Sequence, residues 1–163
     1  AKGFAVDQVA ALLENVGYSN FLVEVGGELY TRGNKGDKEW ILGIEKPDSE
    51  RGTTQIRLIL RNEALATSGD YRNYREEGGR RISHSIDPRT GHPIEHRLAS
   101  ISVIAPTAME ADAWATALNV LGPEDGFSTA EQHNLRIYML IRESEGVFSV
   151  RVTDSFQSHI IPE

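Results

Sequence analysis

Short β-rich runs clustered between a few helical segments constrain the fold of this chain more than any other feature. Alternating apolar and polar residues, or β-branched and aromatic enrichment, mark these runs, and Gly, Pro and Asp separate them. The predicted strands are 21–25, 29–32, 40–45, 54–60, 81–86, 98–105, 135–142 and 147–153, the first two being either two strands or one interrupted strand. Because parallel neighbours need a long crossover, usually a helix, this spacing favours antiparallel pairing. We therefore expect an α+β fold, mainly antiparallel sheet packed with a few helices.

Three helices are predicted. Apolar residues at helical spacing indicate the first over residues 5–16, with Gly17 as its stop. Thr107 and Glu110 have the spacing of a capping box, which opens a second helix that runs to Leu121 before Gly122-Pro123. A short third helix is expected near residues 125–132.

Composition excludes several classes of site and partner. The 163 residues contain no cysteine, which rules out disulfides, thiolate zinc sites and cysteine nucleophiles, so a metal would need oxygen or imidazole ligands. A formal net charge of −7 disfavours nucleic acid as a partner, because the overall field repels phosphate backbones. No apolar run approaches the ~18 residues of a membrane span, so we expect no membrane contact by this segment.

Asp112 and Thr116 are four residues apart in the second predicted helix and therefore share one face. A carboxylate beside a hydroxyl suits a hard cation, and Mg²⁺ is often held by one or two carboxylates while waters and phosphates complete its shell. The spacing is equally that of a solvent-facing Asp and a Thr bonded back to its own helix, which is the commoner case.

The stretch S-H-S-I-D-P-R-T-G, residues 83–91, combines a turn with groups that act on protons or phosphates. Asp87-Pro88 and Thr90-Gly91 explain the turn. His84 could accept a proton from a hydroxyl, with Asp87 to orient it; the alternative is a surface histidine, with Asp87 serving only the turn. We assign no role to the other four histidines.

Two weaker signals lie elsewhere in the chain. Gly26-Gly27 could let a cofactor approach the backbone, or could form a bulge or hairpin turn. Tyr71 and Tyr74 could stack on an aromatic ligand, although packing is the commoner role. The sequence has no dinucleotide fingerprint opening a helix, no G-x-S-x-G and no P-loop, so serine hydrolase and nucleotide triphosphatase activities are unsupported.

Five collinear motifs together resemble the ApbE family of FAD:protein FMN transferases, once described as thiamine biosynthesis lipoproteins. The motifs are K-G-F-A-V-D-Q-V-A, F-L-V-E-V-G-G-E-L, A-L-A-T-S-G-D-Y-R-N-Y, S-H-S-I-D-P-R-T-G and A-P-T-A-M-E-A-D-A-W-A-T-A-L-N-V-L-G. The resemblance implies an ApbE-like (T-fold-like) core. It also implies that residues 1–163 form the C-terminal portion of a single ApbE-like domain whose N-terminal half is absent here, consistent with a sequence that begins without methionine.

The resemblance gives roles to particular residues. Asp112 and Thr116 match the family's magnesium ligands, with the number of metals left open. His84 matches its proposed base. Lys2 and Ile86 match positions that contact FAD, and Asp87 and Arg89 would support the loop.

The activity implied is Mg²⁺-dependent transfer of FMN from FAD to a Thr or Ser hydroxyl of an acceptor protein, with release of AMP. The acceptor would be a flavoprotein subunit of a redox complex, and the missing N-terminal half would be the other partner. Two alternatives stay open: a non-catalytic FAD-binding or scaffold module, and an FAD pyrophosphatase that gives FMN and AMP. The resemblance favours a periplasmic or membrane-anchored lipoprotein as the parent protein and leaves the cytoplasm open.

Overall fold

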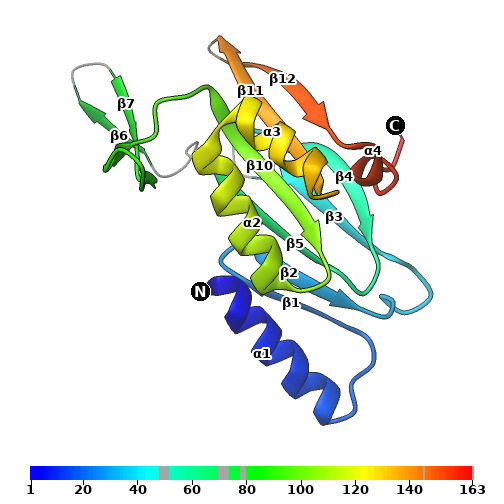
Figure 1. Ribbon diagram of the computed structural model, residues 1–163. Helices are drawn as coiled ribbons and strands as arrows, with labels where there is room; N and C mark the ends of the chain where they lie inside the picture. The colour runs from blue at the N-terminus through cyan, green and yellow to red at the C-terminus, as the bar shows by residue number, and fades with distance from the viewer. Residues whose placement is uncertain (48–51, 70–73, 78–79, 145, 163) are drawn as a thin grey trace.

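A six-stranded antiparallel sheet forms the centre of the molecule (Figure 1). The computed structural model describes residues 1–47, 52–69, 74–77, 80–144 and 146–162. In spatial order the strands are β1 (Phe21–Val25), β2 (Glu28–Arg32), β5 (Ala64–Gly69), β10 (Leu98–Ala105), β11 (Arg136–Ser144) and β12 (Val147–Val152). The antiparallel α+β fold expected from the sequence is confirmed.

Three helices cover one face of this sheet. They are α1 (Lys2–Asn15), α2 (Ala108–Leu121) and α3 (Pro123–Gln132). Figure 1 shows α2 lying along β5 and β10, with α1 beside the start of α2 and next to β1 and β2. Buried residues of α1 and α2 pack with the inward side chains of β1, β5, β10 and β11 in one continuous core.

A second core fills the opposite face of the sheet. There the hairpin of β3 (Trp40–Glu45) and β4 (Thr54–Leu60) packs with the short helix α4 (Asp154–Gln157). Phe156 and Leu58 are fully buried in this layer. Because both faces are covered, all eight residues of β10 are buried, Ser100 and Ser102 included.

Two small hairpins complete the fold: β6 (Tyr74–Glu77) with β7 (Arg80–Ser83), and β8 (Ile86–Asp87) with β9 (His92–Pro93). The strand expected over 81–86 is thus two strands, separated by a bend at His84. Tyr71 and the side chain of Tyr74 lie outside the described residues, so the stacking prediction stays open. Within the described part of the chain, no helix has the length and apolar character needed to cross a membrane.

Local sequence explains two of the boundaries. Gly26 and Gly27 both have positive φ, 61° and 97°, and form a two-residue turn that pairs Val25 with Glu28, so the hairpin alternative is confirmed. Thr107 is the N-cap of α2 and its hydroxyl accepts the Glu110 N–H at 3.2 Å, as the capping sequence predicts.

Candidate functional site

The N-terminal ends of α1 and α2 meet in what we call the α1–α2 junction, formed by Lys2, Gly3, Asp7, Ala108 and Asp112. Gly3 is buried there, and a Cβ on it would lie 2.2 Å from the Ala108 carbonyl oxygen. One turn later, Asp7 accepts the N–H groups of Ala108 and Met109 at 2.8 and 2.9 Å. The first turn of α2 is therefore capped by a residue about a hundred positions away in the sequence.

Asp112 faces this junction rather than solvent. Its side chain is 16% exposed, and its Oδ2 accepts the Gly3 N–H at 3.0 Å and the Ala1 amino group at 3.2 Å. Burial opposes ionisation, but these two hydrogen bonds, the charge of the Ala1 amino group and the nearby Lys2 charge outweigh it and lower the pKa of Asp112. The solvent-facing alternative for Asp112 is wrong, and an ionised carboxylate stands at this position.

Thr116 lies one turn further along the same face of α2. Its side chain is exposed, and its Oγ1 lies 3.4 Å from the Ser68 hydroxyl near the end of β5. On the other side of β5, Thr67 and Ser102 hydroxyls share a 2.7 Å hydrogen bond. The Asp112 carboxylate and the Thr116 hydroxyl thus lie on one face of α2, with the Ser68 hydroxyl of β5 beside Thr116.

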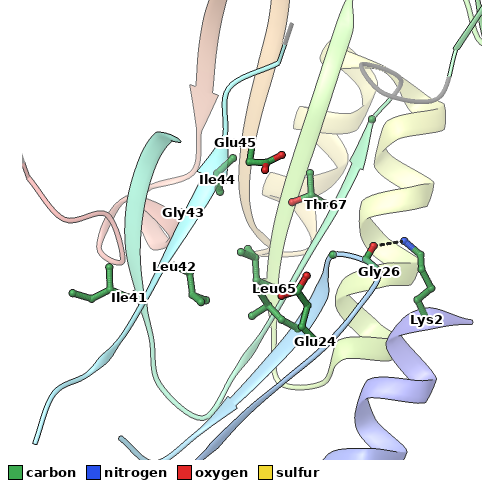
Figure 2. Close-up of a pocket in the computed structure, with 13 residues that line it drawn as sticks. Lys2, Glu24, Gly26, Ile41, Leu42, Gly43, Ile44, Glu45, Leu65 and Thr67 are labelled. Carbon is green, nitrogen blue, oxygen red and sulfur yellow. Dashed lines mark hydrogen bonds between the residues drawn. The ribbon is translucent and has the colours of Figure 1, made fainter. Parts of the chain in front are cut away.

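Lys2 extends from α1 to the turn between β1 and β2. Its ammonium donates to the Gly26 carbonyl oxygen at 3.3 Å (Figure 2). It also donates to Glu28 Oε1 at 2.5 Å. Glu28 is buried, and burial raises its pKa although Lys2 opposes this shift. Sequence reasoning missed Glu28, yet a signal existed: a two-residue turn places it opposite Val25, on the apolar side of β1.

A cavity of about 500 Å³ begins at Lys2 and Gly26 and continues between β3 and the main sheet. Figure 2 shows Ile41, Leu42 and Ile44 of β3 on one side of it and Lys2 at the other. Leu65, Thr67 and Gly69, alternate residues of β5, line it as well. Lys2, Glu24, Glu45 and Thr67 add polar side chains to the apolar residues of β3, and a concave cavity of this size can hold a small molecule.

His84 and Ile86 lie on a separate segment. His84 is exposed at the bend between β7 and β8, and Ile86 is a half-exposed residue of β8, a strand that contacts α2. The guanidinium and the backbone N–H of Arg89 both donate to the Asp87 carboxylate, and the N–H lies 2.8 Å from Oδ1. This pairing lowers the pKa of Asp87. The turn predicted at Asp87-Pro88 and Thr90-Gly91 is confirmed, while the roles of His84 and Ile86 stay predictions.

Two other histidines have structural contacts that the sequence did not reveal. His96 Nδ1 accepts the Leu98 N–H at 3.3 Å, so its Nε2 is the nitrogen that donates to the Asn119 carbonyl, at 2.7 Å. His159 Nε2 lies 3.1 Å from Glu63 Oε2, which links the C-terminal segment to the start of β5.

The donor set at Asp112 suits a hard cation that keeps ligands from outside the chain. Among residues 1–47, 52–69, 74–77, 80–144 and 146–162, no group of three or more His, Cys, Asp or Glu side chains is arranged to hold a metal. Asp112 and the Thr116 and Ser68 hydroxyls offer oxygen ligands, which Mg²⁺ prefers and which it supplements with water and substrate phosphates. These residues therefore fit a Mg²⁺ site that water and a substrate phosphate complete, and not a site in which the protein supplies every ligand.

Comparison with known proteins gives one consistent result. Residues 1–141 match the model of the ApbE family. The chain is 44% identical over 163 residues to the FAD:protein FMN transferase of Escherichia coli (strain K12) and 47% identical over 160 residues to that of Haemophilus influenzae. It covers 46% of each, so it spans about half the length of these curated relatives. The crystal structure of the apo form of Pseudomonas stutzeri flavinyl transferase ApbE superposes with a TM-score of 0.86 at 41% identity, covering 98% of this chain and 49% of that one.

Proposed function

The chain belongs to the ApbE family, and we propose that it is the C-terminal part of an FAD:protein FMN transferase. The observation that carries this proposal is the oxygen-lined face of α2. There an ionised Asp112 lies near Lys2, which lines a cavity large enough for part of a dinucleotide, and Thr116 follows one turn further along α2. Relatives that carry the transferase name support it across 99% of this chain.

Asp112 and Thr116 are the proposed magnesium ligands, with further oxygens from backbone, water or FAD. When bound, Mg²⁺ supplies positive charge that offsets the charge developing on the pyrophosphate. The chain itself fixes the Asp112 carboxylate through the Gly3 N–H, so the ligand is held in place and ionised at neutral pH. Lys2 adds a second positive charge at the cavity entrance.

The proposed reaction is displacement at the FMN-side phosphorus of FAD. The hydroxyl oxygen of an acceptor Thr or Ser forms the new P–O bond, and the bond between that phosphorus and the bridging oxygen breaks, so that AMP leaves with this oxygen. The hydroxyl proton passes to His84, whose exposed position in a bend lets an acceptor protein reach it. Ile86, in the next strand, would contact FAD through its backbone.

Intact-mass analysis of the full-length parent protein tests this reaction. Incubation with FAD, Mg²⁺ and a peptide carrying an acceptor Thr should add one FMN to the peptide and release AMP. Asp112→Ala, or removal of the metal with EDTA, should abolish this increase in the mass of the peptide. The control Asp37→Ala removes an exposed carboxylate from the loop before β3, and the mass increase of the peptide should be unchanged.

Two other outcomes would replace the proposal. Release of FMN and AMP with no gain of mass on the peptide would show a pyrophosphatase, in which water takes the place of the acceptor hydroxyl. Binding of FAD with no AMP under any metal condition would show a non-catalytic module, with His84 as a turn residue only.

Partner and location are also proposals. The motif resemblance supports a flavoprotein subunit of a redox complex as the acceptor, and the periplasm as the compartment, either soluble or as a membrane-anchored lipoprotein. Fractionation of cells that express the tagged parent protein, with protease added to spheroplasts, tests the location: protection from protease would place it in the cytoplasm.

A further inference from the structure

Glu28 is a buried carboxylate at the start of β2 for which the proposed reaction gives no role. Its side chain is 3% exposed, and Oε1 accepts from the Lys2 ammonium at 2.5 Å. Oε2 is also buried and has no hydrogen-bond partner among the residues that the structure describes. The Oε2 atom has therefore lost its contact with water and gains no hydrogen bond from the described residues in return.

Stability alone does not explain such a residue. A buried ion pair is often replaced by apolar residues of similar volume with no loss of stability, because removing charges from water costs as much as their attraction returns. Here the cost of burying an ionised Glu28 is larger, since the negative charge of Asp112 also disfavours its ionisation. A methionine or leucine opposite Val25 would satisfy the packing on this side of the hairpin.

The effect of Glu28 is to fix the position of Lys2. A lysine side chain on a helix surface ordinarily samples many rotamers, and this freedom is lost when it binds a ligand. In this structure the ammonium is held between Glu28 and the Gly26 carbonyl. A Cβ on Gly26 would lie 3.0 Å from Lys2 Cδ, so the glycine turn also accommodates the lysine stem.

The two contacts leave one donor of Lys2 for a ligand. An ammonium has three N–H groups, and within the described residues two of them go to Glu28 and Gly26. Lys2 also lines the cavity and its side chain is 52% exposed. A positive charge held at a fixed point of a cavity entrance binds an anionic oxygen with less loss of entropy than a free lysine does.

We infer that Glu28 is a positioning residue, which holds the Lys2 ammonium at the cavity entrance where it binds a phosphate oxygen of the dinucleotide substrate. The inference rests on the proposed function, since it takes FAD as the ligand. Glu28 acts only through Lys2 and touches no reacting atom.

A double-mutant cycle in the full-length parent protein tests this inference. The variants are Glu28→Gln, which keeps the shape and removes the charge, Lys2→Met, and the two combined. The measured quantities are the Kd for FAD, from quenching of flavin fluorescence, and the thermal unfolding midpoint. Glu143→Gln is the control, because Glu143 forms an exposed ion pair with Arg97 and should change neither quantity.

The expected result separates affinity from stability. Glu28→Gln and Lys2→Met should each raise the Kd for FAD about tenfold, and the double variant no more than Lys2→Met alone. Lys2→Met should lower the unfolding midpoint, because it leaves a buried carboxylate unpaired, and adding Glu28→Gln should restore the midpoint without restoring FAD affinity.

Two results would overturn the inference. If the wild-type protein binds FAD, an unchanged Kd in Glu28→Gln, or additive effects of the two substitutions on Kd, would make Glu28 a purely structural residue. Absence of FAD binding by the wild-type protein would remove the proposed function and this inference together.

Discussion

Asp112 and Glu28 show at the residue scale how position decides the chemistry of a carboxylate. Both lie near Lys2, and the pKa values of the two shift in opposite directions. Asp112 receives the Gly3 N–H, which favours its ionised form, whereas desolvation dominates at Glu28 and favours the protonated form. Asp112 is therefore suited to bind a cation, and Glu28 to hold a single ammonium.

The lowered pKa of Asp112 predicts a pH-dependent contribution to stability. A carboxyl whose folded pKa is below its ordinary value of 3.8 stabilises the fold above 3.8, and this stabilisation is lost as the pH falls through the folded value. In residues 1–163, where the Ala1 amino group is one of the causes of this shift, Asp112→Asn should lower the free energy of unfolding by about 1–2 kcal/mol at neutral pH. The difference between variant and wild type should shrink below pH 3.8.

Urea denaturation of both proteins across this pH range measures the difference. Asp37→Asn, in an exposed loop, is the matched control and should show no such dependence. A difference that stayed constant with pH would mean that Asp112 stabilises the fold by its shape and not by its charge.

At the scale of elements, the contact between α1 and α2 determines where Asp112 lies. Gly3 and Asp7 are four residues apart on one face of α1, and both meet the first turns of α2. Gly3 permits the close approach because it has no Cβ, and Asp7 caps the free N–H groups that begin α2. The two helices therefore present Lys2 and Asp112 as one unit.

Gly3→Ala should separate these helices. The added Cβ would lie 2.2 Å from the Ala108 carbonyl oxygen and 2.8 Å from Asp112 Cβ, so the backbone must move. We expect the free energy of unfolding of the parent protein to fall by about 1–3 kcal/mol, although alanine is the better helix former.

Chemical denaturation measures the loss, and Gln8→Ala serves as the control because Gln8 is exposed on the same helix. The control should stay within about 0.5 kcal/mol of wild type. Equal or higher stability of Gly3→Ala would show that the junction tolerates a wider spacing.

Over the whole molecule, the sheet carries a core on each face, but α1 also has an apolar side that these cores do not bury. Its exposed large apolar residues, together with the tyrosine that follows the helix, are Phe4, Val9, Leu12, Val16 and Tyr18. Val9, Leu12 and Val16 recur at helical spacing and so share one face, and an exposed apolar face of this kind marks an interaction surface. The chain also spans only about half the length of its curated relatives.

Residues 1–163 expressed alone should therefore associate with one another, bind FAD weakly and transfer no FMN. Sedimentation velocity and an FAD titration measure the first two, and the peptide assay described above measures the third. Leu12→Glu, which places a charge in the apolar side of α1, should reduce the association. A monomeric chain with full transferase activity would contradict this prediction.

The sequence by itself determined the elements whose signals are local. The strands at 40–45, 54–60 and 98–105 were predicted with their observed bounds, and the Thr107 cap was read from a four-residue pattern. The start of α1 at Lys2 was not predicted, because its first turn has no side-chain cap and is held instead by α2. The bend that divides 81–86 was also missed, because it follows from the pairing of β8 with β9.

The pairing of Asp112 and Thr116 likewise came from helix periodicity, and their match to a family motif came from sequence alone. Only the tertiary structure decided that Asp112 faces Gly3, that Asp7 caps α2, and that Glu28 is buried against Lys2. These contacts join residues 26 to 109 positions apart. No local pattern encodes them, because they form only when the order of strands in the sheet brings α1, α2 and the β1–β2 turn to one place.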